Sequence, residues 1–390
     1  MAFIPYSCQS VTHADAEAVL AVLRSPYLTQ GPVVPRFEAA FARVHEVGHA
    51  VAVSSATAGL HIGCLALGVG PGSRVWTSPN SFLASANCAL YCGATIDFVD
   101  IDPRTRNMSV ASLTEKLRDA RRLGTLPDLL IPVDFSGLPC DLREMRALAD
   151  KFGFRILQDA SHATGATYLG HPVGARYADA TVFSFHAVKI VTTAEGGLVT
   201  TQDAELAARL RLLRSHGMTR EPSEMDHASP GGWYYEQQCL GYNYRMTELQ
   251  AALGDSQLKR LGDMHARRKD RASRYDELLR DLPLVLPVQL EDRLSSLHLY
   301  VVEIDEERTR VRRNEVFALM RAAEIGVNVH YIPIHTQPYY QRMGFAHDAA
   351  PHSVRYYERA LSIPLHPELT DVDQDRVVQV LSSALGSTAT

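Results

Sequence analysis

The stretch "HAVAVSSATAGLHIGCLALG", residues 49–68, decides the fold class, because a short apolar run leads through two serines into an apolar segment of helical length. We predict a strand over 49–55 and an amphipathic helix over 56–68 that ends at a glycine. Short strands that are apolar throughout are typical of a parallel sheet covered by helices, which binds its ligands at the carboxyl ends of the strands. The same order repeats up to residue 160, with strands over 74–79, 94–101, 128–135 and 154–160 and helices over 82–93, 109–124 and 141–153.

The rhythm changes after residue 245, where a long helical pattern over 246–282 begins. Beyond it, strands are expected over 298–304 and 326–332. We therefore predict an α/β protein with a large α/β/α domain over residues 1–250 and a smaller C-terminal α+β domain over 251–390, connected by the long helix.

The composition excludes several classes of protein. With 46% hydrophobic and 21% charged residues the chain is globular. A net charge of -5 argues against a general nucleic-acid binder, and no apolar run has the ~20 residues of a membrane span. The start, "MAFIPYSCQS", lacks the features of a signal peptide, so we expect a cytoplasmic protein. Its six scattered cysteines do not suggest a disulfide framework, and we expect them to be small buried hydrophobic residues.

Two motif matches are rejected on their context. "HEVGH", residues 45–49, fits the zinc motif H-E-x-x-H, which needs both histidines on one helix. Gly48 should end the helix and His49 should open a strand, so the two imidazoles would diverge. "GVGPG", residues 68–72, follows a helix and lacks the third glycine of a dinucleotide loop, so we interpret it as a turn.

Three positions after strand ends suggest a ligand. Residues 54–61 offer the N–H groups of a helix N-terminus beside the hydroxyls of Ser55 and Thr57, which suits a phosphate; the alternative is ordinary N-capping. Asp159 ends a strand among apolar residues and needs a cationic partner such as a protonated pyridine nitrogen; the alternative is a helix N-cap. Phe82 could stack on a flat ring, or it could belong to the core.

Lys189 lies in "TVFSFHAVKIVTTAEGGLVTT", residues 181–201, between a strand over 179–185 and another over 196–201. A lysine amine attacks carbonyls only when it is unprotonated, so a reactive lysine is expected where burial lowers its pKa. A phosphate cradle, an aspartate, an aromatic ring and a lysine at strand ends together describe a site for pyridoxal 5'-phosphate. The lysine would form the Schiff base, and the aspartate would keep the ring nitrogen protonated.

The segments "NSFLASANCALYCGA", "FSFHAVKIVTTAEGG", "RSHGM", "GYNYRMTELQAALG" and "VHYIPIH" follow one another along the chain. In these segments the chain resembles the DegT family of nucleotide-sugar aminotransferases. The resemblance implies fold type I of the pyridoxal-phosphate-dependent transferases, which is aspartate aminotransferase-like. "IPYSCQS", "YLTQGP" and "WYYEQQCLGYNYRMT" resemble the pseudaminic-acid branch, the UDP-4-amino-4,6-dideoxy-N-acetyl-β-L-altrosamine transaminases.

The resemblance also implies roles for individual residues. Lys189 would be the Schiff-base lysine and the general base. Around the cofactor, Asp159 would pair with the ring nitrogen, His162 would contact the oxygen side of the ring, and Ala56, Thr57 and Ser184 would hold the phosphate. Asn243 would reach a phosphate in the neighbouring subunit of a homodimer with shared active sites, and the sugar-nucleotide pocket would be lined by Tyr6, Pro26, Tyr27, Leu28, Thr29, His330 and Tyr331.

Four positions depart from the common family pattern. Ala187 replaces a frequent proline, Ala194 a frequent glycine, Asp134 a frequent histidine, and Gln158 the glutamate of "EDASH". None of these changes removes the proposed lysine. A histidine in place of the lysine is typical of the family's dehydratases, so Lys189 argues against that activity.

The expected reaction moves an amino group from L-glutamate to C4 of a UDP-linked 4-keto-6-deoxy-N-acetyl-hexosamine. The alternatives are a transaminase for another nucleotide-linked 3- or 4-keto-sugar, a ligand-binding regulator without catalysis, and a zinc hydrolase that uses His45 and His49. Arg214 and Arg245 are candidates for binding the glutamate carboxylate, and structural ion pairs are the alternative for both.

Overall fold

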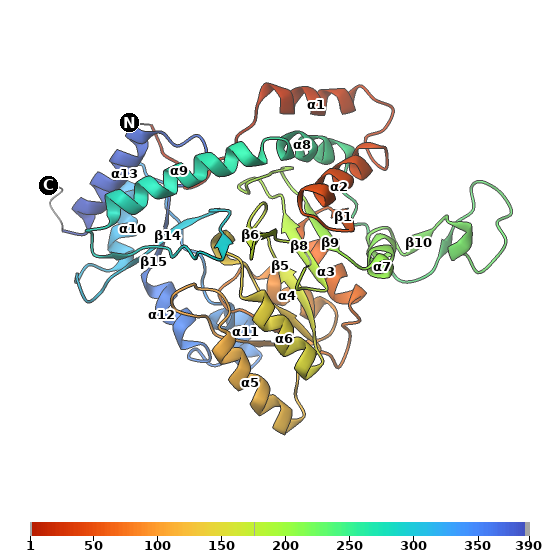
Figure 1. Ribbon diagram of the computed structural model, residues 1–390, viewed down its shortest axis with the longest axis horizontal. Coiled ribbons are helices and arrows are strands. Elements are labelled where there is room, and N and C mark those ends of the chain that lie inside the picture. Colours follow the sequence, from red (N-terminus) through yellow and green to blue (C-terminus); the bar gives the residue numbers. More distant parts are fainter. Residues whose placement is uncertain (1, 175, 387–390) are drawn as a thin grey trace.

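A seven-stranded sheet in the order β1-β9-β8-β5-β4-β2-β3 forms the centre of the computed structural model, which describes residues 2–174 and 176–386 (Figure 1). All seven strands predicted between residues 49 and 201 are present. Only β9 runs antiparallel to its neighbours, which the sequence pattern did not predict. The strands are β1 (His49–Val53), β2 (Arg74–Thr77), β3 (Thr95–Phe98), β4 (Leu129–Ile131), β5 (Arg155–Asp159), β8 (Ala180–Ser184) and β9 (Gly197–Thr201).

Helices cover both faces of this sheet, as predicted. Alternate side chains of β1 show the two faces, because Val51 and Val53 pack with one group of helices and Ala50 and Ala52 with another. The first group is α3 (Ala56–Ala66), α4 (Ala84–Tyr91) and α7 (Ala204–Arg214). The second is α2 (Val33–Val44), α5 (Val110–Leu123), α6 (Leu142–Phe152) and α8 (Glu248–Leu258).

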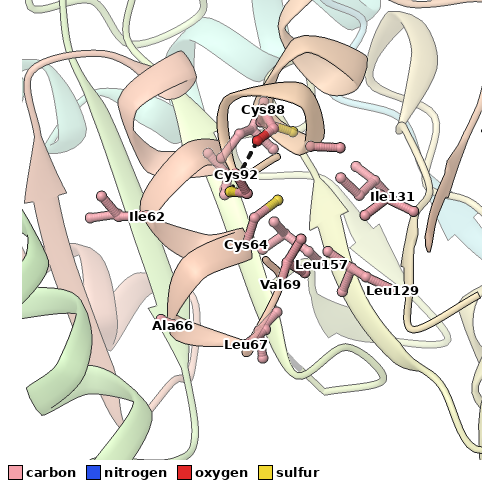
Figure 2. Close-up of a cluster of buried hydrophobic side chains, with 14 of the residues drawn as sticks. Ile62, Cys64, Ala66, Leu67, Val69, Cys88, Cys92, Leu129, Ile131 and Leu157 are labelled. Atoms are coloured by element: carbon pink, nitrogen blue, oxygen red, sulfur yellow. Dashed lines mark hydrogen bonds between the residues drawn. The ribbon is translucent and has the colours of Figure 1, made fainter. Parts of the chain in front are cut away.

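Sulfur-containing side chains contribute to the core between α3, α4 and the sheet. Figure 2 shows Cys64, Cys88 and Cys92 beside leucine and isoleucine side chains, with Cys92 Sγ donating to the carbonyl oxygen of Cys88 (3.2 Å). These three cysteines and Cys140 are buried, as predicted. The prediction is wrong for Cys239, which is exposed, and for Cys8, which is only partly buried.

The single long helix expected over 246–282 is replaced by two helices, α8 and α9 (Leu261–Leu279). The break at Arg260 places its guanidinium 2.6 Å from the buried carboxylate of Asp15, a tertiary contact that the local pattern cannot reveal. After α9 the chain forms a second sheet, β12-β14-β15, and the strand expected over 326–332 is absent, with one bridge between Asn328 and Ser362 instead. The domain boundary near residue 250 stays a prediction.

The second sheet packs with α9, α10 and α13 around its own hydrophobic cluster. Its elements are β12 (Leu284–Val285), β14 (Tyr300–Ile304), β15 (Ala360–Ile363), α10 (Arg313–Ala322) and α13 (Asp371–Ala384). The hairpin of β10 (Met218–Thr219) and β11 (Glu236–Gln237) extends away from the body of the protein (Figure 1). The remaining elements are α1 (His13–Leu23), α11 (Pro338–Arg342), α12 (Pro351–Arg359), β6 (Thr167–Tyr168), β7 (His171–Pro172), β13 (Arg293–Leu294), and the 3₁₀ turns η1 (Phe135–Gly137), η2 (Pro222–Glu224) and η3 (Ile334–Thr336).

The zinc-motif histidines lie on different elements, as their context predicted. Helix α2 ends at Val44, and His49 is the first residue of β1. His45 is buried, stacks on Phe41 at 4.1 Å between ring centroids, and its Nδ1 contacts the carbonyl oxygen of Val173 at 2.7 Å. Within the described residues no group of three metal-binding side chains comes together, and no helix is long and apolar enough to cross a membrane.

Candidate active site

A cavity of about 610 Å³ opens where β5 and β8 end, facing the N-terminus of α3. The carboxyl ends of parallel strands meet at this edge, which is why polar residues far apart in the sequence gather there. The structure brings together ten of the predicted site residues, namely Tyr6, Ala56, Thr57, Phe82, Asp159, His162, Ser184, Lys189, His330 and Tyr331.

One wall of the cavity offers donors for a phosphate. Helix α3 begins at Ala56, and the Ser55 hydroxyl caps it by accepting a backbone N–H at 3.1 Å. The N–H groups of Ala56 and Thr57 precede the first helical carbonyls, so they are left for a ligand. The Ser184 hydroxyl lies on the same cavity. A Cβ on Gly197 would lie 2.5 Å from Ala56 N, so a residue larger than glycine would push the N-terminus of α3 away from β9.

Asp159 presents a buried carboxylate at the end of β5. It is 4% exposed, and within the described part of the chain it makes no ion pair. Its Oδ2 accepts from the Ser85 hydroxyl (2.6 Å) and its Oδ1 from the N–H of Ser161 (3.1 Å). No helix starts here, so the N-cap alternative is wrong. A buried carboxylate held by hydroxyl and amide donors fits a protonated ring nitrogen as its missing counter-charge.

Lys189 lies in the turn between β8 and β9, and its own N–H donates to the carbonyl oxygen of His186 (2.9 Å). Its Nζ is 3.5 Å from Nε2 of His298. Burial lowers the pKa of Lys189 from 10.5 to about 8, although the carboxylate of Asp159 opposes this. The amine is therefore unprotonated in a useful fraction near neutral pH, as its proposed role requires.

Hydrogen bonds fix the tautomer of His162. Its Nδ1 accepts from the backbone N–H of Ser136 (3.2 Å), so a neutral ring must carry its proton on Nε2, which faces Tyr331 Oη at 3.1 Å. Burial, with the nearby Lys189, keeps the pKa of His162 well below its usual range. The ring therefore offers a flat neutral face, 4.5 Å from the ring of His298.

Aromatic and imidazole rings line the rest of the cavity. Phe82 is 60% exposed and lies 6.5 Å from the Tyr331 ring, so the alternative that it belongs to the core is wrong. His330 is buried against Tyr6, with 5.7 Å between ring centroids, and its Nδ1 contacts Ser362 Oγ at 2.7 Å. Burial lowers the pKa of His330 to about 3. This part of the cavity is uncharged at neutral pH.

Two of the departures from the family pattern contact each other. The amide of Gln158 donates to Oδ2 of Asp134 at 2.6 Å, and its oxygen accepts from Thr181 at 2.9 Å. Burial raises the pKa of Asp134 to about 7. Two of the four departures therefore form one buried hydrogen-bonded pair.

The other predicted residues lie outside this cavity. Asn243, Pro26, Tyr27, Leu28 and Thr29 are exposed on the surface of the chain. Arg214 forms an ion pair with Glu38 at 2.6 Å and donates to the carbonyl oxygen of Ala52. Its role is therefore structural, which was the alternative to binding the glutamate carboxylate. Arg245 lines a separate small cavity with Glu38. The described residues therefore place no arginine on the cavity of Lys189.

Sequence reasoning missed several residues of the site, among them Ser85 and His298, which line the cavity, and Ser136, which binds His162 from outside it. Ser85 lies in the first turn of α4, four residues after Ser81, and the two hydroxyl oxygens are 2.7 Å apart. Ser136 and His298 come from connecting segments, and neither has a local pattern that marks it.

Comparison with known proteins agrees with this geometry. The model of the DegT/DnrJ/EryC1/StrS aminotransferase family matches residues 9–382. The chain is 40% identical over 382 residues to the spore coat polysaccharide biosynthesis protein SpsC of Bacillus subtilis, covering 97% of this chain and 96% of that protein.

Two solved structures are also similar. Helicobacter pylori PseC, an aminotransferase of pseudaminic-acid biosynthesis, has a TM-score of 0.89 at 31% identity and covers 99% of this chain and 100% of its own. The putative sugar aminotransferase Spr1654 of Streptococcus pneumoniae in its PLP form has a TM-score of 0.88 at 30% identity, with 100% of both chains covered. This chain therefore belongs to the DegT/DnrJ/EryC1/StrS aminotransferase family, and it is a sugar aminotransferase whose cofactor is pyridoxal phosphate.

Proposed function

We propose that the enzyme transfers an amino group from L-glutamate to C4 of a UDP-linked 4-keto-6-deoxy-N-acetyl-hexosamine and so forms UDP-4-amino-4,6-dideoxy-N-acetyl-β-L-altrosamine. The observation that carries the transfer chemistry is the partly buried amine of Lys189, which shares a cavity with the unpaired carboxylate of Asp159. The similarity to PseC over the whole chain supports the choice of sugar. We expect the reaction to take place in the cytoplasm.

Pyridoxal phosphate, when bound, supplies an electron sink for the carbon that exchanges its proton. Lys189 would act as the general base that moves this proton between the substrate carbon and the cofactor in each half of the reaction, which its lowered pKa allows. Asp159 stabilises the positive charge on the ring nitrogen, and Ala56, Thr57 and Ser184 hold the phosphate. His162, fixed by Ser136, supports the ring and excludes water from one side.

The lack of arginine on this cavity supports shared active sites. The cofactor phosphate and the sugar diphosphate bring negative charge. Among the described residues of one chain, the cavity offers the amine of Lys189, while burial keeps His162 and His330 neutral. We propose a homodimer in which the surface with Asn243 and Arg245, and the nearby exposed Pro26–Thr29 segment, faces the partner's cavity. Counter-charges for the diphosphate and for the glutamate carboxylate then come from both chains.

A second candidate sugar is favoured by one observation. SpsC is 40% identical to this chain, a higher identity than the 31% of PseC. A transaminase for a different nucleotide-linked 3- or 4-keto-sugar would use the same residues around Lys189. The two proposals differ only in the substrate that accepts the amino group.

The test follows the visible absorbance of the bound cofactor. The purified enzyme is treated with L-glutamate until the band fades, freed of glutamate, and offered UDP-linked and dTDP-linked keto-sugars one at a time. We expect the band to return with the UDP-linked 4-keto-6-deoxy-N-acetyl-hexosamine. If the band returned only with another sugar, the proposed substrate would be wrong and the proposed transfer chemistry would stand. If glutamate never bleached the band, L-glutamate would not be the amino donor. A colourless protein would favour the alternative of a ligand-binding regulator without catalysis.

A Lys189→Ala variant is the control for the chemistry itself. It should bind the cofactor without turnover, because the described residues that line the cavity include no other lysine. Its turnover at the wild-type rate would refute the role of Lys189.

A further inference from the structure

His298 is the residue in closest polar contact with the reactive amine. It lies just before β14, is 2% exposed, and its Nε2 faces Lys189 Nζ at 3.5 Å. Within the described part of the chain it is the hydrogen-bond partner of that amine. The contact links the small second sheet to the turn that carries the lysine.

The backbone of His298 is held on both sides. Its N–H donates to the carbonyl oxygen of Ser136 (3.0 Å), and its carbonyl oxygen accepts from the buried guanidinium of Arg268 (3.3 Å). Ser136 has a φ of 60°, a conformation that costs energy for a residue other than glycine. The same Ser136 donates its N–H to His162, so one strained turn fixes the positions of both imidazoles.

The surroundings of His298 determine which of its ring nitrogens carries the proton. Among the described residues, its buried Nδ1 has no hydrogen-bond partner. A buried N–H without an acceptor costs more free energy than a buried nitrogen acceptor without a donor. The proton of the neutral ring therefore belongs on Nε2, and Nδ1 is the unpaired acceptor. Nε2–H must then donate to the nitrogen of Lys189. An ammonium has no lone pair to accept that bond, and a neutral amine has one.

The charged and titratable groups around this contact all lower the pKa of the His298 imidazole. Burial first, and then the neighbouring Lys189, keep the pKa of His298 well below its usual range, so the ring stays neutral. The carboxylate of Asp159 raises the pKa of Lys189 and so favours the charged amine. The groups that face the pair from the packed elements are Asp159 at the end of β5, His162, His330 and Arg268 on α9.

We propose that His298 is a positioning residue that donates a hydrogen bond to the free, uncharged amine of Lys189 and holds it where it exchanges protons with the substrate. This inference rests on the proposed role of Lys189 as the general base. Without this contact the amine lies at the end of four rotatable bonds, and the described residues give it no other hydrogen-bond partner in the cavity. A displacement of about 1 Å costs roughly 10²-fold in rate.

The first experiment measures how fast the holoenzyme exchanges the Cα proton of L-glutamate for deuterium in D₂O, followed by NMR. His298→Leu should slow the exchange about 10²-fold, while the cofactor absorbance and the melting temperature stay close to wild type. His298→Gln should recover most of the rate at about pH 10, where the amine is unprotonated in both proteins, because its amide N–H can donate in place of Nε2–H. A purely structural role would instead lower cofactor content and melting temperature together.

The second experiment has a readout that does not depend on activity. The cofactor-free full chain is acetylated briefly at a series of pH values, and the labelling of Lys189 is quantified by mass spectrometry. His298→Gln should raise the apparent pKa of the amine by about one pH unit, because an amide can turn its oxygen toward the ammonium and an Nε2–H cannot. An unchanged pKa of Lys189 in His298→Gln would overturn the proposal. If His298→Leu does not fold, the measurement on His298→Gln is sufficient to decide.

Two control variants separate the possible failures. Lys189→Ala should abolish the exchange; if it does not, the proposed function fails. If Lys189→Ala is inactive but His298→Leu exchanges at the wild-type rate, only the role of His298 fails. His45→Leu changes another buried histidine, stacked on Phe41 away from the cavity, and should leave the exchange rate unchanged.

Discussion

Replacing Lys189 with methionine should stabilise the cofactor-free protein, and the gain should depend on pH. Methionine keeps the length of the side chain and removes the charge. The pKa of Lys189 is lowered from 10.5 to about 8, chiefly by burial. At 1.36 kcal/mol per pH unit this corresponds to about 3 kcal/mol of unfavourable free energy for the charged amine in the folded state.

The sign of the pH dependence follows from the two pKa values. Below pH 8 the amine is charged in the folded and the unfolded chain, so the wild type carries the whole cost. Between pH 8 and 10.5 the folded chain releases its proton first, and the stability of the wild type rises toward that of the variant. The neutral amine also accepts the hydrogen bond of His298, which methionine cannot do. Above pH 8 this contact favours the wild type by about a further 1 kcal/mol, so the difference between the two proteins shrinks further and its slope with pH is the informative quantity.

Melting temperatures of both cofactor-free proteins between pH 6 and 10 test this reasoning. For a chain of 390 residues, about 3 kcal/mol corresponds to roughly 4 °C. The variant should melt a few degrees higher at pH 6 to 7, and the difference should shrink above pH 8. A difference that does not change with pH would show that the amine ionises like one in water and would refute the argument.

Four further substitutions have definite expected outcomes. Asp159→Asn keeps the shape and removes the counter-charge, so the turnover number measured with glutamate should fall about 10²-fold or more. Ser85→Ala removes one donor to Asp159 and should lower the same rate about tenfold. Gly197→Ala places a Cβ 2.5 Å from Ala56 N, so the dissociation constant of the cofactor, measured by titration, should rise at least about tenfold. Ala194→Gly relieves a φ of 65° and should raise the free energy of unfolding by about 1 kcal/mol, measured as a small rise in melting temperature.

The strands of the main sheet could be predicted because each is a short apolar run between turn residues, a signal that needs no tertiary information. The direction of β9 could not be predicted in this way. The chain turns back after Lys189, and Gly197 pairs with Ser184, so β9 must run against its neighbour. The break between α8 and α9 was also missed, because it depends on the contact of Arg260 with Asp15, residues 245 positions apart.

The residues proposed to hold the cofactor could be predicted because each lies at or just after a strand end, where the fold gathers functional groups. Asp159 and Lys189 belong to this class. The residues that orient them do not, because His298 reaches the cavity, and Ser136 reaches His162, only through packing between segments distant in the sequence. Their roles depend on distances and on hydrogen-bond partners that a linear pattern does not contain.

The central claim is that Lys189 is the amine that binds the cofactor. Reduction of the holoenzyme with borohydride would fix the cofactor covalently to the lysine that holds it, and mass spectrometry of the digested protein would identify that residue. We predict the pyridoxyl mass on the peptide that contains Lys189, and its absence after prior treatment with L-glutamate. A pyridoxyl group on another lysine would contradict the account.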